Sequence, residues 1–148
     1  MQYMSYSDED GWDYRSYEQY LERWRPGLAL DLADLLSEER LLMTGDHTLH
    51  DAYVSSLGRR FEPAVIADVP RRQSIRLELV GRYGDRVFEL SYDDVEEFHS
   101  DRDWAALNDL DAHELVQDSE GRFRHHLQFR NGTMVIVCRL VRFDERHL

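Results

Sequence analysis

The sequence contains no lysine, only three prolines and a single cysteine among its 148 residues. Cys138 alone cannot form an intramolecular disulfide, and it excludes a zinc site built from several cysteines. Few prolines and 42% hydrophobic residues exclude a disordered chain. No apolar run approaches the roughly 18 residues that span a bilayer. We therefore expect a single folded domain over residues 1–148.

Signals for secretion and for catalysis are also missing. The segment Gln2–Asp10 is polar and acidic, with no apolar leader, so we expect a soluble cytoplasmic protein with a loosely ordered N-terminus over residues 1–13. There is no Gly-x-Ser-x-Gly elbow and no phosphate-binding glycine loop. Cys138 lies among valine and isoleucine and is expected to be an inert core thiol. We expect no catalytic residues, no cofactor and no enzymatic activity.

The formal net charge of -12 is unevenly distributed. Residues 1–51 carry -8, residues 52–92 carry +2, residues 93–120 carry -10, and residues 121–148 carry +4. The overall acidity disfavours nucleic acid or an anionic membrane as a partner. Because like charges oppose compaction, the 93–120 segment is expected at the surface.

The first third of the chain has helical spacing. Ser16 and Gln19 form a capping-box pattern that predicts a helix start, and Arg25-Pro26-Gly27 ends that helix. A leucine pattern over residues 28–36 predicts a second helix. Whether this helix continues to Met43 is left open by the pattern.

From residue 51 onward the hydrophobic period changes to two, which is typical of strands. Strands are predicted at residues 52–57, 74–80, 87–92, 113–117, 123–129 and 133–143. A loop bracketed by Pro63 and Pro70 separates the first two. Asn131-Gly132 favours a two-residue type I′ hairpin turn. The last strand is apolar at both parities, which indicates a central strand covered on both faces. The fold class is therefore α+β: two N-terminal helices, then a mostly antiparallel sheet of five to six strands with hairpins.

Two clusters of residues could form a functional site, and for each there is also a purely structural explanation. His47, His50 and Asp51 have ligand chemistry for a divalent metal, which would suit a small metal-dependent enzyme. The simpler reading is that these residues hydrogen-bond the loop that enters the first strand, and we favour it. The second cluster is an arginine face on strand 123–129 that could bind an anion, RNA or an acidic partner, or simply be solvated: Arg122, Arg124, His126 and Arg130.

The acidic segment gives the more specific hypothesis. Dense negative charge steers a basic partner, and aromatic side chains can anchor it. The alternative is a solvated loop whose aromatics belong to the core. The candidate partner-binding residues are Asp93, Asp94, Glu96, Glu97, Phe98, Asp101, Asp103, Trp104, Asp109 and Asp111.

Three features together resemble a known group of proteins. These are Leu49-His50-Asp51-Ala52 before a strand, the strand pair that ends in Glu89–Val95, and the hairpin from Glu114 to Phe143. They resemble small bacterial domains of unknown function with an L-H-D-A/S start to their sheet. Members of that group are similar to immunity proteins of polymorphic toxin systems. The resemblance implies a protein that binds and neutralises a cognate toxin.

The leading hypothesis from sequence is therefore an acidic, non-enzymatic protein-binding module, most specifically an immunity protein for a basic toxin such as a nuclease. The alternatives are the metal-dependent enzyme and a regulatory or scaffold domain that uses the arginine face. The sequence leaves the identity of the partner and the oligomeric state open.

Overall fold

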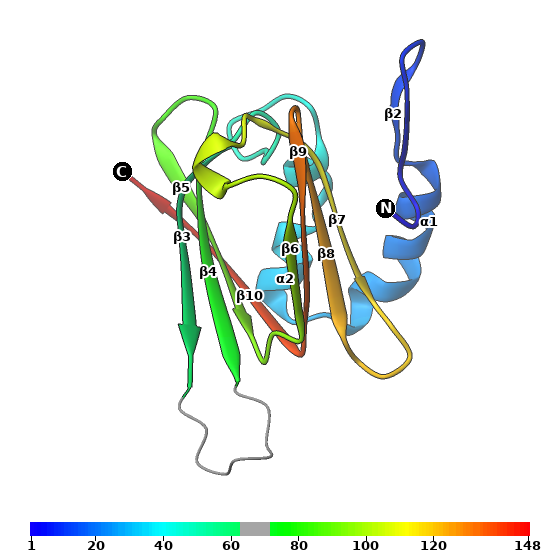
Figure 1. Ribbon diagram of the computed structural model, residues 1–148. Helices are drawn as coiled ribbons and strands as arrows, with labels where there is room; N and C mark the ends of the chain where they lie inside the picture. Colours follow the sequence, from blue (N-terminus) through cyan, green and yellow to red (C-terminus); the bar gives the residue numbers. More distant parts are fainter. Residues whose placement is uncertain (63–71) are drawn as a thin grey trace.

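Two four-stranded antiparallel sheets share one hydrophobic core in the computed structural model, which describes residues 1–62 and 72–148 (Figure 1). One sheet has the strand order β10-β5-β4-β3 and the other β6-β9-β8-β7, while β1 and β2 form a separate hairpin. The elements are β1 (Ser5–Ser7), β2 (Gly11–Asp13), α1 (Arg15–Trp24), η1 (Arg25–Gly27), α2 (Leu30–Leu35), α3 (Glu38–Leu41), β3 (Tyr53–Phe61), β4 (Gln73–Val80), β5 (Arg86–Asp93), β6 (Glu97–Ser100), η2 (Trp104–Ala106), β7 (Leu110–Gln117), β8 (Phe123–Phe129), β9 (Gly132–Cys138) and β10 (Leu140–His147).

The α+β class is confirmed, but the arrangement differs from the expected single sheet. The two sheets face each other, so alternate residues of each strand fill a shared core. The strands predicted at 74–80, 87–92 and 123–129 match β4, β5 and β8 closely. The strand expected at 52–57 is longer, and the short strands β1, β2 and β6 were not predicted. The loop bracketed by Pro63 and Pro70 lies outside the described residues.

The helical region also differs in detail. α1 begins at Arg15, so Ser16 lies inside the helix and the Ser16–Gln19 capping box is wrong. Asp13 supplies the interaction instead, since its carboxylate accepts a hydrogen bond from the backbone N–H of Arg15 at 3.0 Å. The predicted helix over 28–36 is the shorter α2, and α3 is a separate single turn. None of the helices in the described part of the chain is long and apolar enough to cross a membrane.

The chain changes sheets at Arg139, which corrects the prediction of one strand from 133 to 143. β9 lies inside one sheet and β10 forms an edge of the other. Residues of even number point into the core before this corner, as Ile136 and Cys138 do, and residues of odd number do so after it, as Val141 and Phe143 do. The run is therefore apolar at both even and odd positions because its core-facing positions change from even to odd at this corner.

The hairpin at Asn131-Gly132 is present, but its turn is not type I′. Phe129 pairs with Gly132, so the turn residues are Arg130 and Asn131. Neither Asn131 nor Gly132 has a positive φ. Gly132 is required for space instead, because a Cβ there would lie 2.6 Å from Asp101 Oδ1 and 2.8 Å from Leu107 Cδ2.

The N-terminal segment and helices cover the sheet edges formed by β7 and β10. The Tyr17 hydroxyl donates to the carbonyl of Leu115 at 2.7 Å and accepts from its N–H at 2.9 Å. On the other sheet, Asp31 accepts from the N–H of Phe143 at 2.9 Å. Glu114, buried on β7, accepts backbone N–H groups from three residues of the segment expected to be loosely ordered: Gln2, Tyr3 and Met4. The helices therefore protect backbone groups that an edge strand leaves free.

Candidate functional site

The acidic segment 93–120 is largely paired with arginines from elsewhere in the chain. Intramolecular pairing reduces the field that this segment projects toward a partner. Binding of a basic protein by this segment remains a prediction. Most carboxylates of the segment already form ion pairs within the chain. The pairs are Asp93–Arg142 (2.7 Å), Asp94–Arg72 (3.5 Å), Glu96–Arg139 (2.9 Å), Asp109–Arg130 (3.7 Å) and Asp111–Arg130 (3.5 Å).

Four of the predicted partner-binding residues meet in one groove between β3 and β6: Phe98, Asp101, Asp103 and Trp104. Phe98 and Trp104 are partly buried. They line the groove, as partner-binding residues would, and they also pack against the core, as the alternative predicts. The two carboxylates accept backbone hydrogen bonds, Asp101 from Thr133 at 2.8 Å and Asp103 from Ala105 at 3.0 Å. Glu97 lies outside the groove lining and is exposed.

The arginine face on β8 is mostly neutralised as well. Arg122 lies 2.8 Å from Asp118, and Arg130 lies 2.9 Å from Asp51. His126 is half-buried, and burial lowers its pKa. Arg124 is exposed and forms no ion pair with any described residue. The face therefore offers one free guanidinium rather than a stripe of four cationic groups.

His50 and Asp51 lie close together, with His50 Nε2 3.5 Å from Asp51 Oδ1, but His47 is directed elsewhere. His47 Nδ1 lies 3.0 Å from Glu145, whereas His50 Nδ1 lies 2.9 Å from the carbonyl of Asp111. Asp51, at φ 63°, pairs with Arg130. Within residues 1–62 and 72–148, no group of three or more His, Cys, Asp or Glu side chains is arranged to hold a metal ion.

A buried ionic cluster around Glu145 was not predicted from sequence. Arg40 and Arg86 are 7% and 5% exposed, and both donate to this carboxylate, at 2.6 Å and 2.8 Å. Burial raises the pKa of Glu145, but hydrogen bonds from Arg40 and His47 outweigh burial and lower it overall. The Arg40 guanidinium also lies 4.8 Å from the ring centroid of Phe143. The cluster fixes α3 on β10 and is structural.

A second unexpected group lies between the sheets. Tyr92 on β5 hydrogen-bonds His125 on β8 at 2.7 Å, and His125 Nε2 lies 3.1 Å from Nδ1 of His113. Burial lowers the pKa of His113 to about 4, and burial also holds the pKa of His125 well below its ordinary value. Both rings are therefore neutral at physiological pH. None of these three residues lines the cavity between α1 and α3 or the groove between β3 and β6, which favours a structural role.

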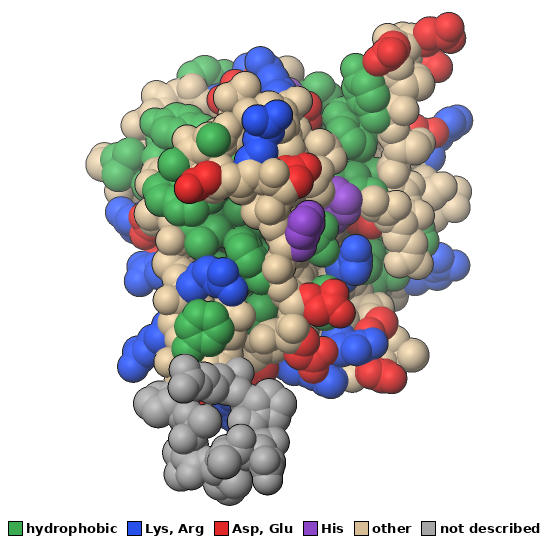
Figure 2. Space-filling view, in the orientation of Figure 1, with side chains coloured by type: hydrophobic (Ala, Val, Ile, Leu, Met, Phe, Trp, Pro, Cys, Tyr) green, Lys and Arg blue, Asp and Glu red, His purple; other side chains and the backbone are tan. Residues whose placement is uncertain are grey.

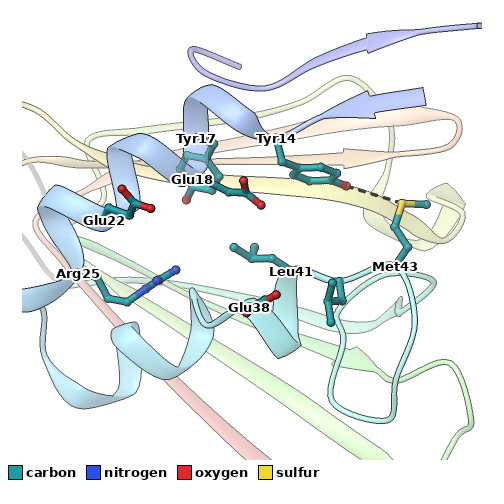
Figure 3. Close-up of a pocket in the computed structure, with 9 residues that line it drawn as sticks. Tyr14, Tyr17, Glu18, Glu22, Arg25, Glu38, Leu41 and Met43 are labelled. Carbon is teal, nitrogen blue, oxygen red and sulfur yellow. Dashed lines mark hydrogen bonds between the residues drawn. The ribbon is translucent and has the colours of Figure 1, made fainter. Parts of the chain in front are cut away.

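A cavity of about 430 Å³ lies between α1 and α3 (Figure 3). Its apolar wall includes Tyr17 and Leu41, and Leu42 and Met43 are 48% and 45% exposed at its rim. The Tyr14 hydroxyl lies 4.0 Å from the sulfur of Met43. These residues come from two helices and the loop after α3, so the cavity depends on how α3 is held by Arg40.

The charge around this cavity is not compensated. Glu18 and Glu22 lie one helical turn apart on α1, and Glu38 faces them from α3. No ion pair joins these three carboxylates to any other described residue. Arg25 is the one cation in the lining; its guanidinium donates to the carbonyl of Leu36 at 2.6 Å, and its Nε is buried without a partner in the described structure. The cavity has a formal charge of -2 and an apolar wall, which suits a cationic side chain with an aliphatic stem.

Part of the negative charge around this cavity could be recognised in the sequence. The balance of -8 over residues 1–51 and the spacing of Glu18 and Glu22 were visible in it. That Glu38 faces the same space depends on the packing of α3, which local sequence does not reveal.

Comparison of the chain with family models, with curated proteins and with solved structures gives no match. The candidate function therefore depends on the geometry of the chain itself.

Proposed function

We propose that this chain is a non-enzymatic module that binds a basic protein, and that the partner docks over the cavity between α1 and α3. The observation that carries the proposal is the set of three unpaired carboxylates, Glu18, Glu22 and Glu38, around a cavity with an apolar wall. An arginine or lysine side chain of the partner would place its cation among the carboxylates and its stem against Leu41.

The distribution of charge supports this face over the 93–120 segment. Four arginines pair with acids of residues 93–120: Arg122, Arg130, Arg139 and Arg142. The acids of α1 and Glu38 have no such pairing in the described structure. Figure 2 shows further acidic side chains at the end of the projecting N-terminal hairpin. This hairpin carries Asp8, Glu9 and Asp10 between β1 and β2, next to the N-terminal end of α1. Exposed Leu42 and Met43 supply the apolar contact that an anchor needs.

The more specific form of the proposal is an immunity protein that neutralises a basic toxin such as a nuclease. Its support is the acidic cavity together with the resemblance carried by Leu49–Ala52. A nuclease binds polyphosphate through cationic side chains, and such side chains are the complement of this cavity.

The test uses a triple variant, Glu18→Arg, Glu22→Arg and Glu38→Arg, and the purified product of the gene adjacent to the one that encodes this chain. The control carries the same charge change at exposed acids elsewhere: Asp46→Arg, Glu97→Arg and Asp144→Arg. We expect calorimetry to show tight binding by the wild type and the control, and at least about tenfold weaker binding by the cavity variant. Equal binding by the two variants, or a toxin that stays fully active with the wild type in excess, contradicts the proposal.

A further inference from the structure

β3 ends one of the two sheets, and its outer edge pairs with no strand of the described structure. An edge strand presents alternate N–H and C=O groups that can pair with another extended segment. The last four residues, 58–61, are all exposed. A Cβ at Gly58 would meet no atom within 4 Å, so space around the middle of this edge is open.

The charge of this edge differs from that of the rest of the protein. β3 carries Arg59 and Arg60 and no acid in nine residues. Neither arginine forms an ion pair with a described residue, whereas the arginines of β10 and the β8–β9 turn are paired with carboxylates. Figure 2 shows basic side chains along the side of the molecule where β3 lies. Two guanidinium groups without an ion pair in the described structure are therefore on β3, against one, that of Arg124, on the β8 face indicated by the sequence.

A groove continues from this edge toward β6, which is the end strand of the opposite sheet. It has a volume of about 610 Å³, and its apolar part is formed by Leu57 of β3 together with Phe98 and Trp104. Charged residues also line it: Arg59, Arg102, Asp101 and Asp103. The Arg59 guanidinium lies 4.6 Å from the ring centroid of Phe98 and spans the opening between the two sheets. The helices cover the β7 and β10 edges, whereas on the β3–β6 side of the described structure the short helix η2 packs against β3 and this groove lies beside it.

We propose that the free edge of β3 binds an extended, carboxylate-bearing segment of a partner protein as an added strand. Backbone hydrogen bonds to the edge supply affinity, and carboxylates on the face of the added strand that Arg60 shares select an acidic sequence. Apolar side chains on the opposite face of the added strand lie against Leu57, Phe98 and the aliphatic stem of Arg59, because Leu57 and Arg59 line the same groove. A second copy of this chain fits less well, because pairing β3 with itself brings four unpaired arginines together.

The probe is a synthetic peptide of roughly ten residues that alternates glutamate with valine, bearing a fluorophore. Fluorescence anisotropy measures its affinity for the full chain, next to a peptide with lysine in place of glutamate. A third peptide carries N-methyl groups on alternate amides, which removes the edge-pairing donors and keeps the charge. We expect binding of the glutamate peptide alone, weakened at least about tenfold by N-methylation on the pairing side.

The protein variants are Arg60→Glu and the double variant Arg59→Glu, Arg60→Glu, with Arg124→Glu as the matched control on the other sheet. We expect about threefold weaker binding for the single variant, at least about tenfold for the double variant, and no change for the control. Circular dichroism confirms folding, and Arg60, which makes no cation–π contact, keeps the test informative if Arg59 proves structural. The cavity triple variant binds the peptide normally, so this proposal and the proposed function fail separately.

Three results would overturn the inference: equal binding of the glutamate and lysine peptides, no effect of N-methylation, or no effect of reversing Arg60 and Arg59. Tighter binding of a single-stranded oligonucleotide to the same arginines would assign the edge to nucleic acid instead. Sedimentation that shows a dimer lost in Arg60→Glu would assign it to a second copy.

Discussion

The Tyr92 hydroxyl lies 2.7 Å from Nδ1 of His125 and links the two sheets through the core. His125 is in turn 3.1 Å from His113, and both histidines are fully buried with no carboxylate partner in the described structure. Burial away from water favours the neutral form of an imidazole over the charged form. The pair therefore makes the sandwich sensitive to acid.

Stability is expected to fall as the pH drops from about 6.5 to about 4. In this window the unfolded chain binds protons at His113 and His125 that the folded protein excludes, so unfolding is favoured as pH falls. With the pKa of His113 lowered to about 4, this residue alone accounts for about 3 kcal/mol across the window. Urea denaturation at about pH 7 and about pH 4.5 measures the effect. His113→Gln should reduce the pH dependence, whereas the exposed His99→Gln should not; an unchanged dependence in His113→Gln contradicts the assignment.

Glu145→Ala should destabilise the protein by about 3 kcal/mol, because it leaves the buried guanidinium groups of Arg40 and Arg86 without their shared carboxylate. Asp34→Ala is the comparison: Asp34 also pairs with Arg40, at 2.8 Å, but its side chain is 53% exposed, so a loss below about 1 kcal/mol is expected. Chemical denaturation of both variants measures the difference. Equal losses would show that the burial of the cluster does not determine its contribution.

Gly132→Ala should cost about 1–3 kcal/mol, since the added methyl group would overlap Asp101 and Leu107 at the β8–β9 turn. The cause is close approach and not backbone conformation, because Gly132 does not have a positive φ. Gly58→Ala, where a Cβ meets open space, is expected to leave the unfolding free energy nearly unchanged. If Gly132→Ala leaves the unfolding free energy unchanged, the loop that carries Asp101 moves aside at little energetic cost.

Tyr17→Phe should destabilise the protein by about 1–3 kcal/mol, because it leaves the buried N–H and C=O of Leu115 on the edge of β7 without their partner. Tyr6→Phe is the control, since Tyr6 is 59% exposed and its hydroxyl forms no hydrogen bond in the described structure. Hydrogen exchange at the Leu115 amide should accelerate in Tyr17→Phe and not in the control. Unchanged exchange would show that α1 does not protect this edge.

The local pattern determined much of the secondary structure. Alternation at Ile75, Leu77 and Leu79 specified a strand because side chains of a strand alternate between faces. The helical spacing of Tyr17 and Leu21 specified α1, and both are fully buried. The local pattern could not show that the apolar run around Arg139 belongs to two sheets. Such a run is compatible with one strand covered on both faces and with a change of sheet.

Tertiary structure decided where the charge is free. Along the sequence the 93–120 segment carries the largest negative balance, yet Arg122, Arg130, Arg139 and Arg142 lie beside it in space and neutralise much of it. Glu18, Glu22 and Glu38 gain no such partners, and Arg59 and Arg60 on the β3 edge likewise remain unpaired in the described structure. The reason is physical: charges farther apart than about one Debye length are screened, so pairing depends on which groups the fold brings close in space and not on their separation in sequence. The composition established an acidic protein without lysine, and the fold determined which of its carboxylates and arginines have no ion pair in the described structure.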